Sequence, residues 1–115
     1  MILRMWKARS AADQSAAYIE HATKKVFPAI QAIEGQRGEY LLRRTVEGEV
    51  ELVVLTFWDS MESVKKFAGA EPDKAVIDPE ARAMLTSFDE SVIHYEVVET
   101  RRGKSLQAGD KRSFR

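Results

Sequence analysis

The alternation of apolar and polar positions is most informative near the middle of the chain, in residues 49–58, which read EVELVVLTFW. The stretch is rich in β-branched and aromatic residues and therefore predicts a strand. Its middle, LVVL, is apolar at both alternations, which is typical of a central strand covered on both faces. Asp59 follows at the position of a helix N-cap, and Glu62 completes a capping box. The pattern thus predicts a buried strand leading directly into a helix that ends at Gly69.

Similar alternation predicts three more strands, over residues 2–7, 39–46 and 91–99. The short Glu47-Gly48 connection makes a hairpin of the 39–46 strand and the central strand. The two-proline stretch after the second helix predicts a loop with a short helical piece near residues 80–85.

A helix is expected between the first strand and the 39–46 strand. Its apolar stripe consists of Ala12, Ala16, Ile19, Thr23, Val26 and Ile30, at spacings of three and four. Ser10 or Asp13 would cap this helix, and Pro28 would kink or restart it because proline lacks a backbone donor. His21 lies off the stripe and is expected to be solvated.

The predicted order is βαββαβ, an α+β, ferredoxin-like fold with a four-stranded antiparallel sheet. Both helices would cover one face of the sheet, and nothing in the chain would cover the other. Because the central strand is apolar on both faces, we expect a second copy to cover the open face, which gives a symmetric homodimer.

Length and composition fit one soluble domain over residues 1–99, followed by a basic polar tail, residues 100–115. The apolar runs are too short for a membrane helix, and the start lacks a signal-peptide pattern, so a cytoplasmic location is expected. Cysteine is absent, which excludes disulfides and thiolate ligands. The net charge of 0 divides into +5 for residues 101–115 and −5 for the rest, and an acidic body argues against nucleic acid as a partner.

Strand parity suggests which side chains face the helices, if the more apolar face is the covered one. That assumption places Leu3, Met5, Ile93, Tyr95 and Val97 under the helices. The opposite face would then line a cavity with Ile2, Arg4, Trp6, Val92, His94 and Glu96. The middle strands would add Tyr40 with Arg44, and Thr56 with Trp58.

Several segments together resemble the antibiotic biosynthesis monooxygenase family of the dimeric α/β-barrel superfamily: PAIQAIEGQRGEYLLRR, LTFWDSMESVKKFAG and FDESVIHYEVVE. The resemblance covers about residues 1–99 and implies two ferredoxin-like sheets closed face to face. The superfamily includes cofactor-free oxygenases, haem-degrading enzymes and isomerases. Haem-degrading members use an asparagine in the first strand and a tryptophan and histidine in the second helical region. The first strand of this chain has no asparagine, and residues 60–85 contain neither tryptophan nor histidine, so haem degradation is not expected.

The resemblance implies a cofactor-free monooxygenase acting on a small aromatic or polyketide-like molecule. We expect His94 to act as the base that takes the first proton, and Arg4 or Arg44 to stabilise the anion. Trp6, Tyr40 and Trp58 would form the walls of the substrate pocket. Each also has a purely structural interpretation: His94 as a half-exposed edge residue, the aromatic residues as core, and Arg4 as the ion-pair partner of Glu96.

No cofactor is expected, and two separated histidines without cysteine do not make a metal site. The alternative functions are a non-enzymatic ligand-binding or stress-associated dimer, and an isomerase or cyclase that needs a base but no oxygen.

Overall fold

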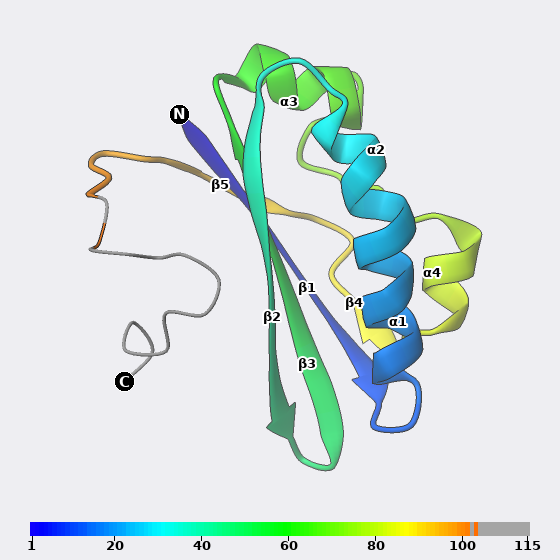
Figure 1. Cartoon of the computed structure of the whole chain (residues 1–115). Coiled ribbons are helices and arrows are strands. Elements are labelled where there is room, and N and C mark those ends of the chain that lie inside the picture. Colours follow the sequence, from blue (N-terminus) through cyan, green and yellow to red (C-terminus); the bar gives the residue numbers. More distant parts are fainter. Residues whose placement is uncertain (102, 104–115) are drawn as a thin grey trace.

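The computed structural model describes residues 1–101 and 103, which fold around a five-stranded antiparallel sheet (Figure 1). Most of the predicted basic tail, residues 100–115, lies outside the described residues. The elements are β1 (Ile2–Ala11), α1 (Ser15–His21), the π-helix η1 (Ala22–Val26), α2 (Phe27–Gln31), β2 (Gln36–Val46), β3 (Glu49–Trp58), α3 (Met61–Ala68), α4 (Pro79–Ala83), β4 (Ser87–Phe88) and β5 (Ile93–Glu96).

The strands lie in the order β2-β3-β1-β4, and β5 also pairs with β1. β4 lies opposite Ala8 and Arg9, and β5 lies opposite Ile2 to Met5, so the two short strands share the fourth position of the sheet. This arrangement confirms the ferredoxin-like α+β prediction. The prediction of one last strand over residues 91–99 is wrong, because Ser91 leaves the sheet and bridges to Lys74.

The helices α1, η1 and α2 run along one face of the sheet, with α4 beside them (Figure 1). Two apolar clusters join helices to the sheet. One consists of Tyr18, Ala22, Leu52 and Ala81, and the other of Phe27, Ile30, Trp58 and Val64. In each cluster the buried strand residue, Leu52 or Trp58, belongs to β3. The central strand therefore anchors the core, as its apolar pattern indicates.

The first helix changes its pitch before Pro28. A π-helical turn over Ala22–Val26 follows α1, and α2 then restarts with Pro28 in its first turn. Because Pro28 has no N–H and its ring would clash with the carbonyl four residues earlier, a regular α-helix is disfavoured here. The predicted kink or restart at Pro28 is therefore confirmed.

Both predicted helix caps are wrong. The cap of α3 is Ser60, whose Oγ accepts from Ser63 N at 3.3 Å, whereas Asp59 forms an ion pair with Arg37. α1 begins after Gln14 without a side-chain cap, since β1 continues as far as Ala11 and includes Ser10. Near the predicted helical piece, α4 forms and is capped by Asp78, whose Oδ1 accepts from Ala81 N at 2.7 Å.

The other face of the sheet is not covered by any helix in the described residues (Figure 1). Large apolar side chains remain about half exposed there, including Tyr40 (56%), Leu42 (45%), Ile93 (50%) and Tyr95 (49%). Monomeric proteins rarely leave such a set of neighbouring apolar residues in water.

Candidate functional site

Two adjoining cavities lie between the sheet and the helices, of about 60 Å³ and about 270 Å³. They share most of their apolar lining, which consists of Trp6, Tyr18, Val26, Ile30, Phe67 and Val76. Arg4 and Thr56 line the smaller cavity only, and Lys25 and Asp78 line the larger one only. The result is an apolar slot with the positive group of Arg4 in the wall of its smaller part.

Arg4 lies on β1 opposite Thr56 of β3 and His94 of β5, and it is only 4% exposed. Its guanidinium donates to Pro72 O and, at 2.9 Å, to Lys74 O, and it lies 5.5 Å from the centre of the Phe67 ring. No carboxylate of the described residues lies within ion-pair distance of Arg4. Burial lowers the pKa of Arg4 to about 10, so the side chain remains positively charged at neutral pH.

His94 connects Arg4 to Asp73. Arg4 Nη1 lies 3.0 Å from His94 Nε2, and His94 Nδ1 lies 3.2 Å from Asp73 Oδ1. Because arginine can only donate, Nε2 must be the acceptor, and the ring proton is then on Nδ1 and is donated to Asp73. Burial and the charge of Arg4 lower the pKa of His94, against the opposite effect of Asp73. His94 is therefore neutral at pH 7, and the lone pair of its Nε2 points at Arg4.

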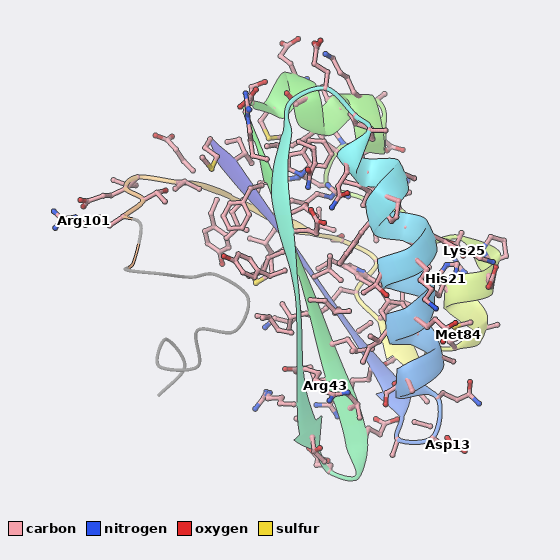
Figure 2. All side chains as sticks on the ribbon, in the orientation of Figure 1. Asp13, His21, Lys25, Arg43, Met84 and Arg101 are labelled. Carbon is pink, nitrogen blue, oxygen red and sulfur yellow. The ribbon has the colours of Figure 1, made fainter. Side chains whose placement is uncertain are left out.

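The loop between α3 and α4, residues 69–78, is held by both histidines of the chain. Asp73 near its middle contacts His94, and Asp78 at its end lies 2.9 Å from His21 Nε2. Figure 2 shows His21 on the side of the first helix that faces α4, where Glu80 also approaches Nδ1 at 3.3 Å. The prediction that His21 is solvated is wrong, because these two carboxylates allow it to be buried.

The predicted assignment of the two sheet faces is reversed. Arg4 and Trp6 of β1 line the cavity under the helices, whereas Ile93 and Tyr95 of β5 are half exposed on the open face. The more apolar face of β1 and β5 is thus the uncovered one. The polar side chains of Arg4 and His94 can lie on the covered face because the α3–α4 loop supplies their hydrogen-bond partners, two backbone carbonyls and the carboxylate of Asp73.

The six predicted site residues do not lie in one pocket. Arg4 and Trp6 line the cavity, and the indole N–H of Trp6 donates to Asp89 O at 2.7 Å. Trp58 faces the helices but is fully buried behind Phe67, and its indole N–H donates to Thr56 Oγ1 at 2.9 Å. His94 contacts Arg4 rather than lining the cavity.

Tyr40 and Arg44 lie on the open face, which is the face predicted for them, but the sheet separates them from Arg4 and Trp6 on the covered face. Tyr40 packs edge-on against Phe57 at 5.9 Å, and Arg44 Nε lies 2.7 Å from Glu51 Oε1. The alternation of β2 places both on the face opposite to Leu41, which packs against the core.

Sequence reasoning missed two cavity residues, Tyr18 and Phe67. Tyr18 lies four positions before Ala22, and this spacing signals one helical face, which is one residue out of phase with the predicted stripe at Ile19. Phe67 belongs to the predicted second helix, and its ring lies between Arg4 and Trp58.

Among the described residues, no group of three His, Cys, Asp or Glu side chains is arranged to hold a metal ion. None of the helices in the same part of the chain is long and apolar enough to cross a membrane.

No protein-family model and no curated protein matches the sequence. The structure resembles a Bacillus cereus protein whose proposed activity is that of an antibiotic biosynthesis monooxygenase, with a TM-score of 0.66 and 20% identity over 91% of this chain and 98% of that chain. It also resembles the haem degrader MhuD of Mycobacterium tuberculosis, solved with two haems in its active site, with a TM-score of 0.57 and 23% identity over 89% of this chain and 100% of that chain. A mutant of MhuD with two manganese protoporphyrin IX molecules per active site gives a TM-score of 0.59. The chain shares the fold of these proteins.

Proposed function

We propose that this protein is a cofactor-free monooxygenase that oxidises a small aromatic anion in the cavity between the sheet and the helices. The observation that carries the proposal is the buried charge of Arg4, which lines an apolar cavity and has only neutral hydrogen-bond partners among its close contacts. A buried cation without a direct ion pair is costly, and the carboxylate of Asp73 reaches Arg4 only through His94, so an anionic ligand would be favoured beside Arg4.

Arg4 would hold the phenolate or enolate form of the substrate, and the apolar walls would exclude water from it. An electron-rich anion of this kind can itself reduce O₂. In the oxidation of a methylene to a carbonyl, one oxygen atom enters the product and the other leaves as water with the two hydrogens. The substrate supplies every electron in this reaction.

His94 would act as a positioning residue rather than as the base predicted from the sequence. Its Nε2 lone pair accepts from Arg4, so it is not free to take a proton from a ligand in the cavity. In the proposed mechanism the substrate therefore binds in its deprotonated form, and His94 and Asp73 fix the orientation of the guanidinium that receives it.

The side chains of the cavity do not fit haem, which the MhuD structures contain. Haem iron needs an axial donor, and no histidine lines the cavity in the described residues. Tyr18 does line it, but burial and Asp78 raise the pKa of Tyr18 to about 12, which opposes the phenolate form that binds iron.

A non-enzymatic ligand-binding protein is the second candidate. The observation in its favour is that neither histidine lines the cavity, so the described residues offer no neutral imidazole as a base. In either case we propose a homodimer formed through the open sheet face, whose half-exposed apolar side chains a second sheet would cover.

The test uses a hydroxylated anthrone as the substrate, with an oxygen electrode and no added metal or flavin. We expect oxygen uptake with the wild type, one atom of ¹⁸O in the product, and at least a hundredfold loss in Arg4→Met. Arg44→Met is the matched control and should retain full activity, since Arg44 lies on the open face. Full activity in Arg4→Met would refute the proposal, and anthrone binding without oxygen uptake would favour the binding protein.

A further inference from the structure

Tyr18 is a buried tyrosine whose hydroxyl has no hydrogen-bond partner among residues 1–101 and 103. The residue is 5% exposed and lines both cavities. In the described residues, no hydrogen bond to Tyr18 Oη is present, and Oη is not among the side-chain atoms fully sealed off from solvent. The hydroxyl therefore keeps some exposure, in a residue that lines both cavities. Buried tyrosine hydroxyls normally find a partner.

Several other polar groups of the slot are already engaged. Trp6 donates to Asp89 O, and Lys25 lies 3.3 Å from Glu80. Asp78 is bound to His21 and caps α4, and Thr56 accepts from the indole of Trp58. Besides Arg4 and the O–H of Thr56, Tyr18 therefore offers the slot a further polar group that a ligand would satisfy.

The ring of Tyr18 is held in place by its surroundings. It belongs to the cluster with Ala22, Leu52 and Ala81, and its centre lies 6.4 Å from the ring of Trp6. Burial and Asp78 raise the pKa of Tyr18 to about 12, so the hydroxyl keeps its proton at physiological pH and acts as a donor. Donor groups fixed before binding cost little conformational entropy when the ligand arrives.

We propose that Tyr18 is a specificity-determining residue whose hydroxyl donates to a neutral oxygen of the ligand, at the part of the slot beside Trp6, two positions along β1 from Arg4. This inference rests on the proposed binding of an aromatic anion in the cavity, and it narrows the ligand class. The ligand would be a flat aromatic monoanion with an uncharged oxygen, hydroxyl or carbonyl, away from its anionic group. A second negative charge at that position would be disfavoured by Asp78, which lines the larger cavity beside Tyr18.

Two naphthoates serve as probes, one unsubstituted and one with a hydroxyl on the ring remote from the carboxylate, and titration calorimetry measures their dissociation constants. The wild type should bind the hydroxynaphthoate about three- to tenfold more tightly, as expected for one neutral hydrogen bond. Tyr18→Phe should bind both probes equally, with an affinity close to that of the wild type for naphthoate. Tyr40→Phe, on the open face, is the matched control and should keep the preference.

The outcomes separate the two proposals. If the wild type shows no preference, or if Tyr18→Phe keeps it, the role of Tyr18 is refuted while the aromatic-anion site stands. If neither probe binds the wild type, the site itself is refuted and the role of Tyr18 with it. Circular dichroism and the thermal midpoint check that Tyr18→Phe is folded. If Tyr18→Phe does not fold, the experiment uses Tyr18→Met, which also removes the hydroxyl.

Discussion

The two faces of the sheet use the same residue types in opposite ways, and two arginines show the contrast. Arg4 on the covered face is buried, donates to carbonyls and an imidazole, and has no carboxylate in contact. Arg44 on the open face is largely exposed and forms an ion pair with Glu51 at 2.7 Å. A guanidinium becomes available to a ligand anion when it is desolvated and has no direct ion pair, and of these two arginines Arg4 meets both conditions.

Apolar residues show the reverse contrast. On the covered face they surround a cavity, whereas on the open face Tyr40, Leu42, Ile93 and Tyr95 form a half-exposed layer. The open face is thus the more apolar one along β1 and β5 although nothing in the described chain covers it. When a second protein molecule covers one face of a sheet, the more apolar face need not be the one that packs against the helices of the same chain.

The largest expected effect comes from two adjacent leucines of β2. Leu41 packs against both core clusters, and Leu42 is 45% exposed on the open face. Leu41→Glu should lower the free energy of unfolding by about 2–4 kcal/mol, because it places a carboxylate in the core. Leu42→Glu should leave the protomer folded but weaken the proposed dimer at least about tenfold.

Denaturant unfolding and analytical ultracentrifugation separate these two results. A stable Leu41→Glu variant, or a Leu42→Glu variant that dimerises like the wild type, would contradict the assignment of the faces to core and partner.

A smaller effect is expected from pH, through His94 at the edge of the covered face. Burial and Arg4 lower the pKa of His94, so the neutral form stabilises the fold. That contribution is complete above the unfolded-state pKa of about 6.5 and is lost as the pH falls below it. The free energy of unfolding should therefore decrease as the pH is lowered from about 7 to about 5. Over this range the unfolded chain binds up to about one proton more than the folded protein.

The control for this prediction is His94→Gln, which keeps a polar side chain but does not titrate. Its free energy of unfolding should decrease less between the two pH values, as measured by urea unfolding at each. Parallel pH profiles for the wild type and the variant would show that His94 is not the titrating group.

The smallest effect is expected on the open face. Arg44→Gln removes an ion pair whose partners are accessible to solvent, and such pairs contribute little to stability. Its thermal midpoint should equal that of the wild type, whereas Arg4→Gln should lower the midpoint because Pro72 O and Lys74 O lose their donor. A clear loss in Arg44→Gln would mean that the open face depends on this pair, for example at a dimer contact.

The order of elements was predictable because its signals are local. The alternation of EVELVVLTFW, the Glu47-Gly48 turn and Pro28 each act over a few residues, and the structure confirms a strand, a hairpin and a helix restart there. The grouping of Arg4 with His94 was also predictable, since strand parity places both on one face.

The remaining features depend on contacts between distant residues. His21 is buried because Asp78, 57 positions away, reaches its ring, and no local pattern announces that contact. Arg4 and Trp6 were expected away from the helices because the alternation of β1 fixes which residues share a face but not which face the helices cover. The α3–α4 loop accepts hydrogen bonds from Arg4 through backbone carbonyls. Because every residue type has a backbone carbonyl, the sequence does not reveal this contact.

The π-turn at Ala22–Val26 lets the helix carry one extra residue without turning its two halves apart, because its bonds run from residue i to residue i+5. Each residue of a regular α-helix advances the direction of its side chain by about 100°. Tyr18 and Ile30 would therefore point about 120° apart on a regular α-helix, yet both line the same slot. A lineage that lost one codon from this turn would return to a regular α-helix and would keep Tyr18 and Ile30 facing the slot.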